Sequence, residues 1–272
     1  MKEIVIAPKQ GWRFLDLREI FEYRELFWFL MKRDLQVRYR QTILGGSWAI
    51  LQPFLTMIVF SVFFGRMAKM PSDGVPYPIF VYVGLLPWTY FANALTQSSG
   101  SVVNNRNYVT KIYFPRAILP SASTLAALVD FAVAMLVLGG LMVWYGVYPD
   151  IHILVFPVLL LAVFLCAVGM GLWLSALNVV YRDVKHVIPF LIQMWMFVSP
   201  VIYPVNIVDD RYKWILALNP MTGIIKGCRA SFLSTVPMDW NLVAISLTMV
   251  VALFISGVIF FARMEGRFAD VI

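Results

Sequence analysis

Aromatic and amide side chains recur in uncharged stretches of this 272-residue chain, at positions where they could hold a sugar polymer. They are Trp48, Gln52, Trp88, Asn93, Gln97, Gln193 and Trp195. Aromatic faces stack on sugar rings, and amides exchange hydrogen bonds with hydroxyl groups. A buried amide without a partner costs several kcal/mol, so a helix that faces only lipid would not carry one. The pattern predicts a glycan passage, with plain helix packing as the alternative for each residue.

Motifs for catalysis are missing from the sequence. There is no G-x-x-x-x-G-K-[ST] sequence to cradle a nucleotide phosphate, no H-E-x-x-H motif and no G-x-S-x-G elbow. The only histidines are His152 and His186, and the distant Cys166 and Cys228 suggest neither a metal site nor a disulfide. We therefore expect no metal, no cofactor and no ATPase site in this chain.

Asp130 is the only acidic residue inside a predicted membrane span. A proton-coupled transporter usually places several ionisable groups within its spans, so this scarcity argues against one. Two interpretations of Asp130 remain. It acts as a relay or substrate contact, or it is a packed aspartate that pairs with the backbone or with a neighbouring helix.

The segments that carry these residues are long enough to cross a bilayer. The chain is 61% hydrophobic and 14% charged, well below the charge of a soluble domain. A helix of about 20 apolar residues spans the roughly 30 Å of hydrocarbon in a membrane. The uncharged runs predict an all-α membrane protein with six transmembrane helices, at residues 41–65, 79–105, 117–145, 153–181, 187–205 and 242–262.

The distribution of basic residues predicts the orientation. Most of the 22 lysines and arginines fall before the first span or in alternate loops, and cytoplasmic segments retain such residues. Both termini are therefore expected in the cytoplasm. The net charge of +7 follows from the same bias and gives no reason to expect a nucleic-acid partner.

Two further segments have helical patterns without the length of a span. Asp16 and Glu19 resemble a capping box, and the apolar residues that follow predict an amphipathic helix in the cytoplasmic interface. Its apolar positions are Leu17, Ile20, Phe21, Trp28, Met31 and Leu35. Near the other end, the apolar pieces 214–218 and 221–225 are separated by Asn219-Pro220, and they predict short re-entrant helices in the outer leaflet.

These patterns give a division into three parts. Residues 1–40 form a cytoplasmic N-terminus with the interface helix, and residues 263–272 form a cytoplasmic tail. Between them, residues 41–262 form the transmembrane domain, which includes the re-entrant gate segment 206–239. Gly169 and Gly171 in the fourth span are small residues that let helices approach closely.

Seven motifs in a fixed order resemble those of a known family. They are RDLQVRYRQTILGGSWAILQP (33–53), GLLPW (84–88), NRNYVTKIYFPRAILP (105–120), LNVVYRDVKH (177–186), SPVIYP (199–204), LNP (218–220) and RFADVI (267–272). Together they resemble the membrane permease subunit of ABC-2-type exporters for lipid-linked polysaccharides such as O-antigen. Exporters of teichoic acid and capsule are relatives of that family.

The resemblance implies a homodimer of six-helix permeases in the bacterial inner membrane, joined to two separate ATP-binding subunits. Those subunits would bind ATP and Mg and hydrolyse the nucleotide, so this chain would be a transport subunit and no enzyme. By the same likeness the segments 17–40 and 104–115 contact the ATPase. The candidate contacts are Lys32, Arg33, Arg38, Arg40, Asn105, Arg106 and Lys111.

The resemblance also implies gate helices at 214–233 and a glycan channel along the first, second and fifth spans. Gate candidates are Asn219, Pro220, Lys226 and Arg229. A lipid diphosphate of the undecaprenyl type would be attracted by Lys226 and Arg229 outside, or by Arg38 and Arg40 inside. Ordinary headgroup contact is the alternative for each cation.

Other functions are weighed against this one. An ABC-2 exporter of teichoic acid, capsule or another lipid-linked cargo fits the same residues. A membrane-embedded transferase acting on lipid-linked sugars would need clustered acids, histidines or a catalytic domain, and the loops are too short and too plain. A secondary transporter is disfavoured by the scarcity of charges in the spans.

Overall fold

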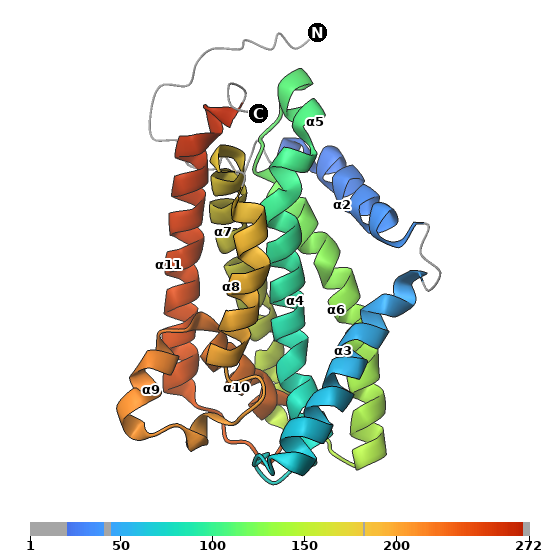
Figure 1. Cartoon of the computed structure of the whole chain (residues 1–272), viewed down its shortest axis with the longest axis vertical. Helices are drawn as coiled ribbons and strands as arrows, with labels where there is room; N and C mark the ends of the chain where they lie inside the picture. The colour runs from blue at the N-terminus through green and yellow to red at the C-terminus, as the bar shows by residue number, and fades with distance from the viewer. Residues whose placement is uncertain (1–20, 41–44, 182, 269–272) are drawn as a thin grey trace.

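The structure is a computed structural model that describes residues 21–40, 45–181 and 183–268. Across these residues all regular secondary structure is helical, as predicted. The long helices run side by side in an elongated bundle (Figure 1). Asp16 and Glu19, the predicted capping box, lie outside the described residues.

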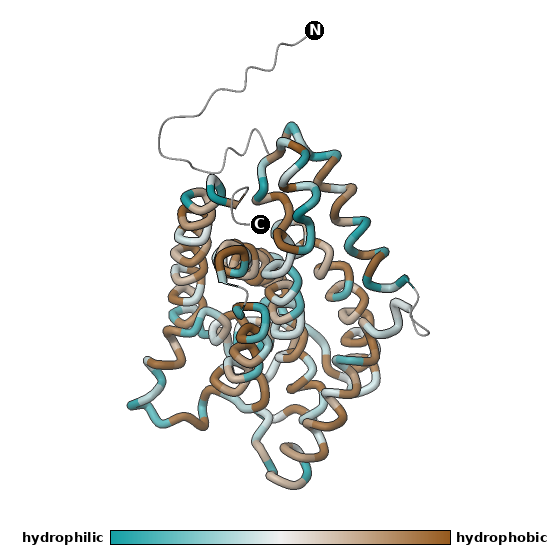
Figure 2. The backbone as a smooth tube through the Cα atoms, turned by 45° about the horizontal axis from the view of Figure 1, so that its top comes forward, coloured by the Kyte–Doolittle hydropathy of each residue, from teal (hydrophilic) through white to brown (hydrophobic). Residues whose placement is uncertain are grey.

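Within the described ranges, five helical segments are long and apolar enough to cross a membrane. They are Gly45–Met67, Tyr77–Asn104 (α4), Ile118–Tyr145 (α6), Ile151–Val180 and Trp240–Glu265 (α11). The first contains α3 (Trp48–Phe60), and the fourth contains α7 (Phe156–Val180). Apolar residues dominate these helices (Figure 2), so the chain is an integral membrane protein.

The predicted fifth span is shorter than expected. The structure forms α8 over Val184–Val198, and 15 residues rise only about 22 Å, less than the hydrocarbon thickness. The cause lies in the sequence that follows. Ser199 precedes Pro200 and has extended backbone, with ψ 143°, because proline disfavours a helical conformation in the residue before it. The uncharged run reaches residue 205, but the helix ends at Val198, shortly before one of the prolines expected to kink or end this span.

α4 is the central helix of the bundle. It packs against α6 and α7 along much of its length and also contacts α3. Phe80, Tyr82 and Phe91 are fully buried, and a stretch that is apolar all round, as the first half of α4 is, belongs in such a position. Its polar second half stays helical, and the amide of Asn178 on α7 donates to the Ser99 carbonyl at 3.0 Å. The amide-bearing stretch thus lies inside the bundle.

α7 and α11 cross at close range. A Cβ atom added to Gly257 would lie 2.1 Å from the carbonyl oxygen of Gly169, so only glycine fits. A Cβ on Gly171 would meet the Ser98 hydroxyl at 2.0 Å. The two glycines predicted to allow close approach, Gly169 and Gly171, therefore both do so.

Two short helices follow α8, where short apolar pieces were predicted. They are α9 (Asp210–Ala217) and α10 (Pro220–Phe232), and both lie at the end of the bundle where α4 and α11 begin (Figure 1). α10 packs against α4, α7 and α11, and most of its residues are buried. α9 is more exposed, with only Leu216 buried.

The opposite end of the bundle carries α2 (Arg24–Tyr39) and α5 (Arg106–Lys111). Leu30 and Met31 of α2 are buried in a cluster with Val109 and Phe114, which joins the two helices. The predicted apolar face is only partly right. Met31 and Leu35 pack inward, whereas Trp28 and Phe21 are exposed; the buried side instead includes Leu26, Phe27 and Leu30.

Candidate functional site

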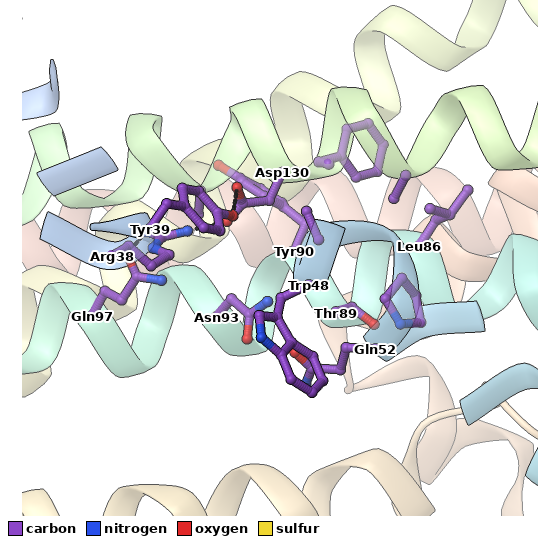
Figure 3. A pocket seen from close by; sticks show the side chains of 15 residues that line it. Arg38, Tyr39, Trp48, Gln52, Leu86, Thr89, Tyr90, Asn93, Gln97 and Asp130 are labelled. Atoms are coloured by element: carbon purple, nitrogen blue, oxygen red, sulfur yellow. Dashed lines mark hydrogen bonds and ion pairs between the residues drawn. The ribbon is translucent and has the colours of Figure 1, made fainter. Parts of the chain in front are cut away.

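A cavity of about 270 Å³ lies between the end of α2 and the helices α3, α4 and α6 (Figure 3). Rings and amides form much of its wall, and two charged residues lie among them. The lining residues are Arg38, Tyr39, Trp48, Ala49, Gln52, Pro53, Leu86, Thr89, Tyr90, Asn93, Gln97, Ala127, Asp130, Phe131 and Ala134.

Helical spacing brings four of the predicted residues together. Trp48 and Gln52 are four residues apart on α3, and Asn93 and Gln97 are four apart on α4, so each pair shares one helix face. Thr89 continues the α4 row one turn earlier. The result is a wall of neutral hydrogen-bonding groups beside an aromatic ring, which suits a hydroxyl-rich ligand.

An ionic network closes the end of the cavity nearest α2. The guanidinium of Arg38 donates from Nη1 to Oδ2 of Asp130 and from Nη2 to Oε1 of Gln97. The hydroxyl of Tyr39 donates to Oδ1 of Asp130. The side chains of Arg38 and Asp130 are 22% and 14% exposed. Of the two interpretations of Asp130, the structure thus shows a pair with a neighbouring helix.

The protonation of Tyr39 fits this network. Burial, reinforced by the bond to Asp130 and by its negative charge, raises the pKa of Tyr39 to about 12. The phenol therefore keeps its proton at neutral pH and acts as a donor. Asp130 thus holds two separate donors from adjacent residues of α2, which limits the cost of placing a carboxylate among apolar helices.

Three predicted channel residues lie elsewhere. Trp88 is buried against Phe91 and Trp195, with ring centroids 5.7 and 6.3 Å away. Trp195 lies on α8, as does Gln193, which is exposed on the outside of that helix. The predicted set therefore divides into a cavity and a separate aromatic cluster between α4 and α8.

Asn219 and Pro220 begin α10. Oδ1 of Asn219 accepts from the backbone N–H of Met221 at 3.0 Å, which caps the helix, and Pro220 occupies the first turn, where its missing N–H costs nothing. These contacts explain both residue types by local structure.

The two basic gate candidates are already engaged. Arg229 is 2% exposed; it donates to the backbone carbonyls of Phe80, Val201 and Tyr203 and lies over the Phe80 ring at 3.7 Å. Nζ of Lys226 pairs with Asp239 at 2.8 Å. This placement does not favour the prediction that Arg229 attracts a lipid diphosphate, because its side chain is enclosed. It connects α10 to α4 and to the turn after α8.

The predicted ATPase contacts also divide. The exposed residues among them are Lys32, Arg40, Arg106 and Lys111. Arg33 instead pairs with Asp34 at 2.7 Å and lies 5.5 Å from the Tyr108 ring of α5. Asn105 bonds the Ser101 carbonyl, and Arg38 points into the cavity. Four of the seven are thus exposed, and the other three are partly buried.

The sequence-based set of channel residues omitted Tyr39, Thr89 and Tyr90. It also omitted Arg38, which was instead a candidate for ATPase contact and for attracting a lipid diphosphate. One signal pointed to Arg38: an acid within a span requires a cation or donor, and Asp130 had none on its own helix. Among the described residues, no group of three or more His, Cys, Asp or Glu side chains is placed to hold a metal ion.

The fold and the cavity define an integral membrane protein with a polar, ring-lined space among apolar helices, an arrangement typical of transport subunits. The chain belongs to the ABC-2 type transporter family, which matches residues 25–233. It is 33% identical to the O-antigen export system permease protein RfbA of Myxococcus xanthus, over 93% of this chain and 98% of that protein.

More distant relatives agree. An O-antigen export system permease protein RfbA of Klebsiella pneumoniae is 24% identical over 91% of this chain and 95% of its own length. The polysialic acid transport protein KpsM of Escherichia coli is 26% identical over 72% of this chain and 77% of its own length. The matched relatives are thus proteins of polysaccharide transport.

Proposed function

We propose that this chain forms the passage of an ABC exporter that moves lipid-linked polysaccharide of the O-antigen type across the bacterial inner membrane. One observation of the structure supports it most. Trp48, Gln52, Asn93 and Gln97, selected from the sequence as glycan contacts, line a single cavity between α3 and α4. The names of the relatives, an O-antigen export permease and a polysialic acid transport protein, support a polysaccharide cargo.

The energy would come from a partner. We infer two copies of this chain and two ATP-binding subunits that bind ATP and Mg. Their docking surface would be the end of the bundle that carries α2 and α5, where Lys32, Arg106 and Lys111 are exposed. Because a shared apolar cluster joins α2 to α5, a push on either helix would be transmitted to the other.

The orientation follows from the same surface. If α2 and α5 meet a cytoplasmic subunit, the end of α11 is cytoplasmic too, because the backbone N–H of Arg116 donates to Glu265 at 2.9 Å. α9 and α10 then lie at the outer side, in the position of the predicted re-entrant gate. The positive-inside distribution of lysine and arginine supports this orientation.

The cargo has a second candidate. The similarity to a polysialic acid transport protein favours a capsule-type polysaccharide over an unrelated substrate. Both cargoes are polar polymers, and both need a path that shields hydroxyl groups from hydrocarbon. The cavity wall of rings and neutral amides fits either of them.

Deletion of the gene tests the proposal and separates it from the transferase alternative. Without an export passage, cells should lack surface polysaccharide and accumulate finished lipid-linked glycan inside. Without a transferase, the finished glycan would never form. Extraction of lipid-linked glycan, together with surface immunoblotting, distinguishes the two. Normal surface polysaccharide in the deletion strain would refute the proposal, as would ATP hydrolysis by the purified chain alone.

A further inference from the structure

The ionic network at the inner end of the cavity joins three helices through one guanidinium. Arg38 of α2 donates to Asp130 of α6 and to Gln97 of α4, and all three side chains line the cavity (Figure 3). The two contacts bridge 92 and 59 residues of sequence. Whatever changes the partner of Arg38 therefore changes how α2 is held to the bundle.

The contact between Arg38 and Asp130 is not the strongest that the two groups can make. Of the guanidinium nitrogens of Arg38, only Nη1 donates to Asp130 in the described part of the chain, whereas a fully engaged arginine and carboxylate form two parallel bonds. Gln97, a neutral amide, receives the other terminal nitrogen. An anion that displaced the neutral Gln97 amide could therefore bind at Nη2.

Asp130 does not depend on Arg38 alone. Its other oxygen accepts from the hydroxyl of Tyr39, which stays protonated. If Arg38 turned away, the carboxylate would keep a hydrogen bond, and the penalty for an unsatisfied buried charge would be reduced. The network is therefore built so that one of its members can exchange partners.

The position and chemistry of Arg38 indicate the exchanging anion. Among the described residues that line the cavity, Arg38 is the only cation. It lies near the end of α2, shortly before the first apolar segment begins at Gly45. Lipid phosphates lie at such membrane boundaries. Arginine is the side chain best matched to a phosphate, because its planar fork binds two phosphate oxygens at once.

We propose that Arg38 is a phosphate-binding residue of this cavity, which Asp130 holds in reserve until a lipid-borne phosphate takes the place of the carboxylate. The exchange would remove one of the links between the end of α2 and α6, while the Tyr39–Asp130 and Asp34–Ser123 bonds remain, so that arrival of the ligand would favour a shift of the end of α2. The inference rests on the proposed function for the choice of ligand, because a lipid-linked polysaccharide carries a phosphate between its lipid and its glycan.

Equilibrium binding to the purified full-length chain in phosphatidylcholine nanodiscs tests this, with undecaprenyl diphosphate as probe. Arg38→Gln should weaken binding about tenfold to a hundredfold, the range of a lost charge-assisted hydrogen bond. Asp130→Asn should strengthen binding about tenfold, because it releases Arg38. Lys185→Gln, which removes an exposed cation at the start of α8, should bind as the unaltered chain does.

The double variant Arg38→Gln/Asp130→Asn guards against misfolding, because it leaves no charge unpaired; it should bind as weakly as Arg38→Gln. Two results would overturn the proposal: unchanged affinity in Arg38→Gln, or weaker binding in Asp130→Asn. Binding is measured without export, so such a failure would leave the deletion phenotype, and with it the proposed function, intact.

The source of the phosphate is resolved by two more probes. Undecaprenol, which lacks phosphate, should bind equally to all variants. Phosphatidylglycerol in place of the diphosphate tests the bulk lipid. If its binding is weakened by Arg38→Gln as much as that of the diphosphate, the site binds any lipid phosphate. If its binding does not change in Arg38→Gln, the site is specific for the transported lipid. A response of undecaprenol to Arg38→Gln would contradict phosphate recognition.

Discussion

The indole N–H of Trp195 donates to Oδ1 of Asn219 across 3.0 Å, and this bond ties α8 to the first turn of α10. The same oxygen caps α10 through Met221, while the Asn219 amide donates to the Ser199 hydroxyl at 2.9 Å. One side chain thus holds a helix start, the turn after α8 and the aromatic cluster around Trp88 in place.

Replacement of Asn219 by alanine should therefore destabilise the protein by about 2 kcal/mol, because it removes the cap and leaves the Trp195 N–H without its partner. Thermal unfolding in detergent, followed by tryptophan fluorescence, measures the change. Asn206→Ala is the control, since that side chain is exposed. An unfolding temperature equal to that of the control would show that the bond carries no stability.

Arg229→Met should cost more, about 3 kcal/mol, because three backbone carbonyls lose a charged donor inside the protein. Arg211→Met on exposed α9 offers a matched control and should stay within about 0.5 kcal/mol. The same unfolding assay applies. If Arg229→Met has the unfolding temperature of the unaltered chain and loses only lipid binding, Arg229 does not stabilise the contact of α10 with α4 and with the turn after α8.

The Lys226–Asp239 pair predicts a dependence of stability on pH. The hydrogen bond from Lys226 lowers the pKa of Asp239, so the folded state favours the carboxylate. Its contribution is complete above the unfolded pKa of about 3.9 and is lost as the pH falls through the lower folded value. A partly exposed pair of this kind contributes about 1 kcal/mol or less. Unfolding temperatures measured from pH 6 to pH 2.5 should therefore fall less in Lys226→Met than in the unaltered chain; parallel curves would contradict the assignment.

Trp48→Ala should reduce surface polysaccharide at unchanged protein abundance, because Trp48 lines the cavity and is 48% exposed. Trp88→Ala should act differently. Trp88 is buried, so its loss should cost about 3–5 kcal/mol and lower abundance itself. Immunoblots of both protein and glycan separate the two effects. Trp144→Ala, at a ring that is 82% exposed and outside the cavity, should leave both unchanged. Full export by Trp48→Ala would remove that residue from the passage.

Charge reversal of Lys111 on α5 should weaken co-purification with the ATP-binding subunit and lower its ATPase activity in the complex. Lys111 is a cleaner test than Arg33, because Arg33 pairs with Asp34. Asp34 in turn accepts from the Ser123 hydroxyl of α6 at 2.7 Å, so a change at Arg33 would also disturb the packing of α2. Lys69→Glu, an exposed cation at the other end of the bundle, is the control. ATPase activity that is equal in Lys111→Glu and in the control would refute the proposed docking surface.

The long helices could be predicted from the sequence because an uncharged apolar run of sufficient length has few other stable conformations. The end of α8 could not be placed from hydrophobicity, because the uncharged run continues to residue 205. The helix instead ends at Val198, because Pro200 favours extended backbone at Ser199. The apolar face of α2 was also misassigned. Its apolar residues lie on both sides, and which side is buried depends on α5 and α6 rather than on the periodicity of α2 itself.

The candidate site shows the same limit. Trp48 and Gln52 on α3, and Asn93 and Gln97 on α4, could be paired because a spacing of four residues places each pair on one face of its own helix. The partner of Arg38 could not be identified, since 92 residues separate it from Asp130, and the need of Asp130 for a cation does not specify which one. Arg229 resembled a surface cation for a related reason. Its hydrogen-bond acceptors are backbone carbonyls, and because every residue has one, the sequence does not mark them.

The contact of Gly169 with Gly257 divides the molecule into a fixed part and parts that are free to shift. Two helix backbones in direct contact cannot slide past each other without a steric clash. We therefore expect α7 and α11 to move as one rigid body throughout the transport cycle. Widening of the cavity should therefore come from its opposite wall, where α3 joins the bundle and the end of α2 is held through Arg38 and Tyr39.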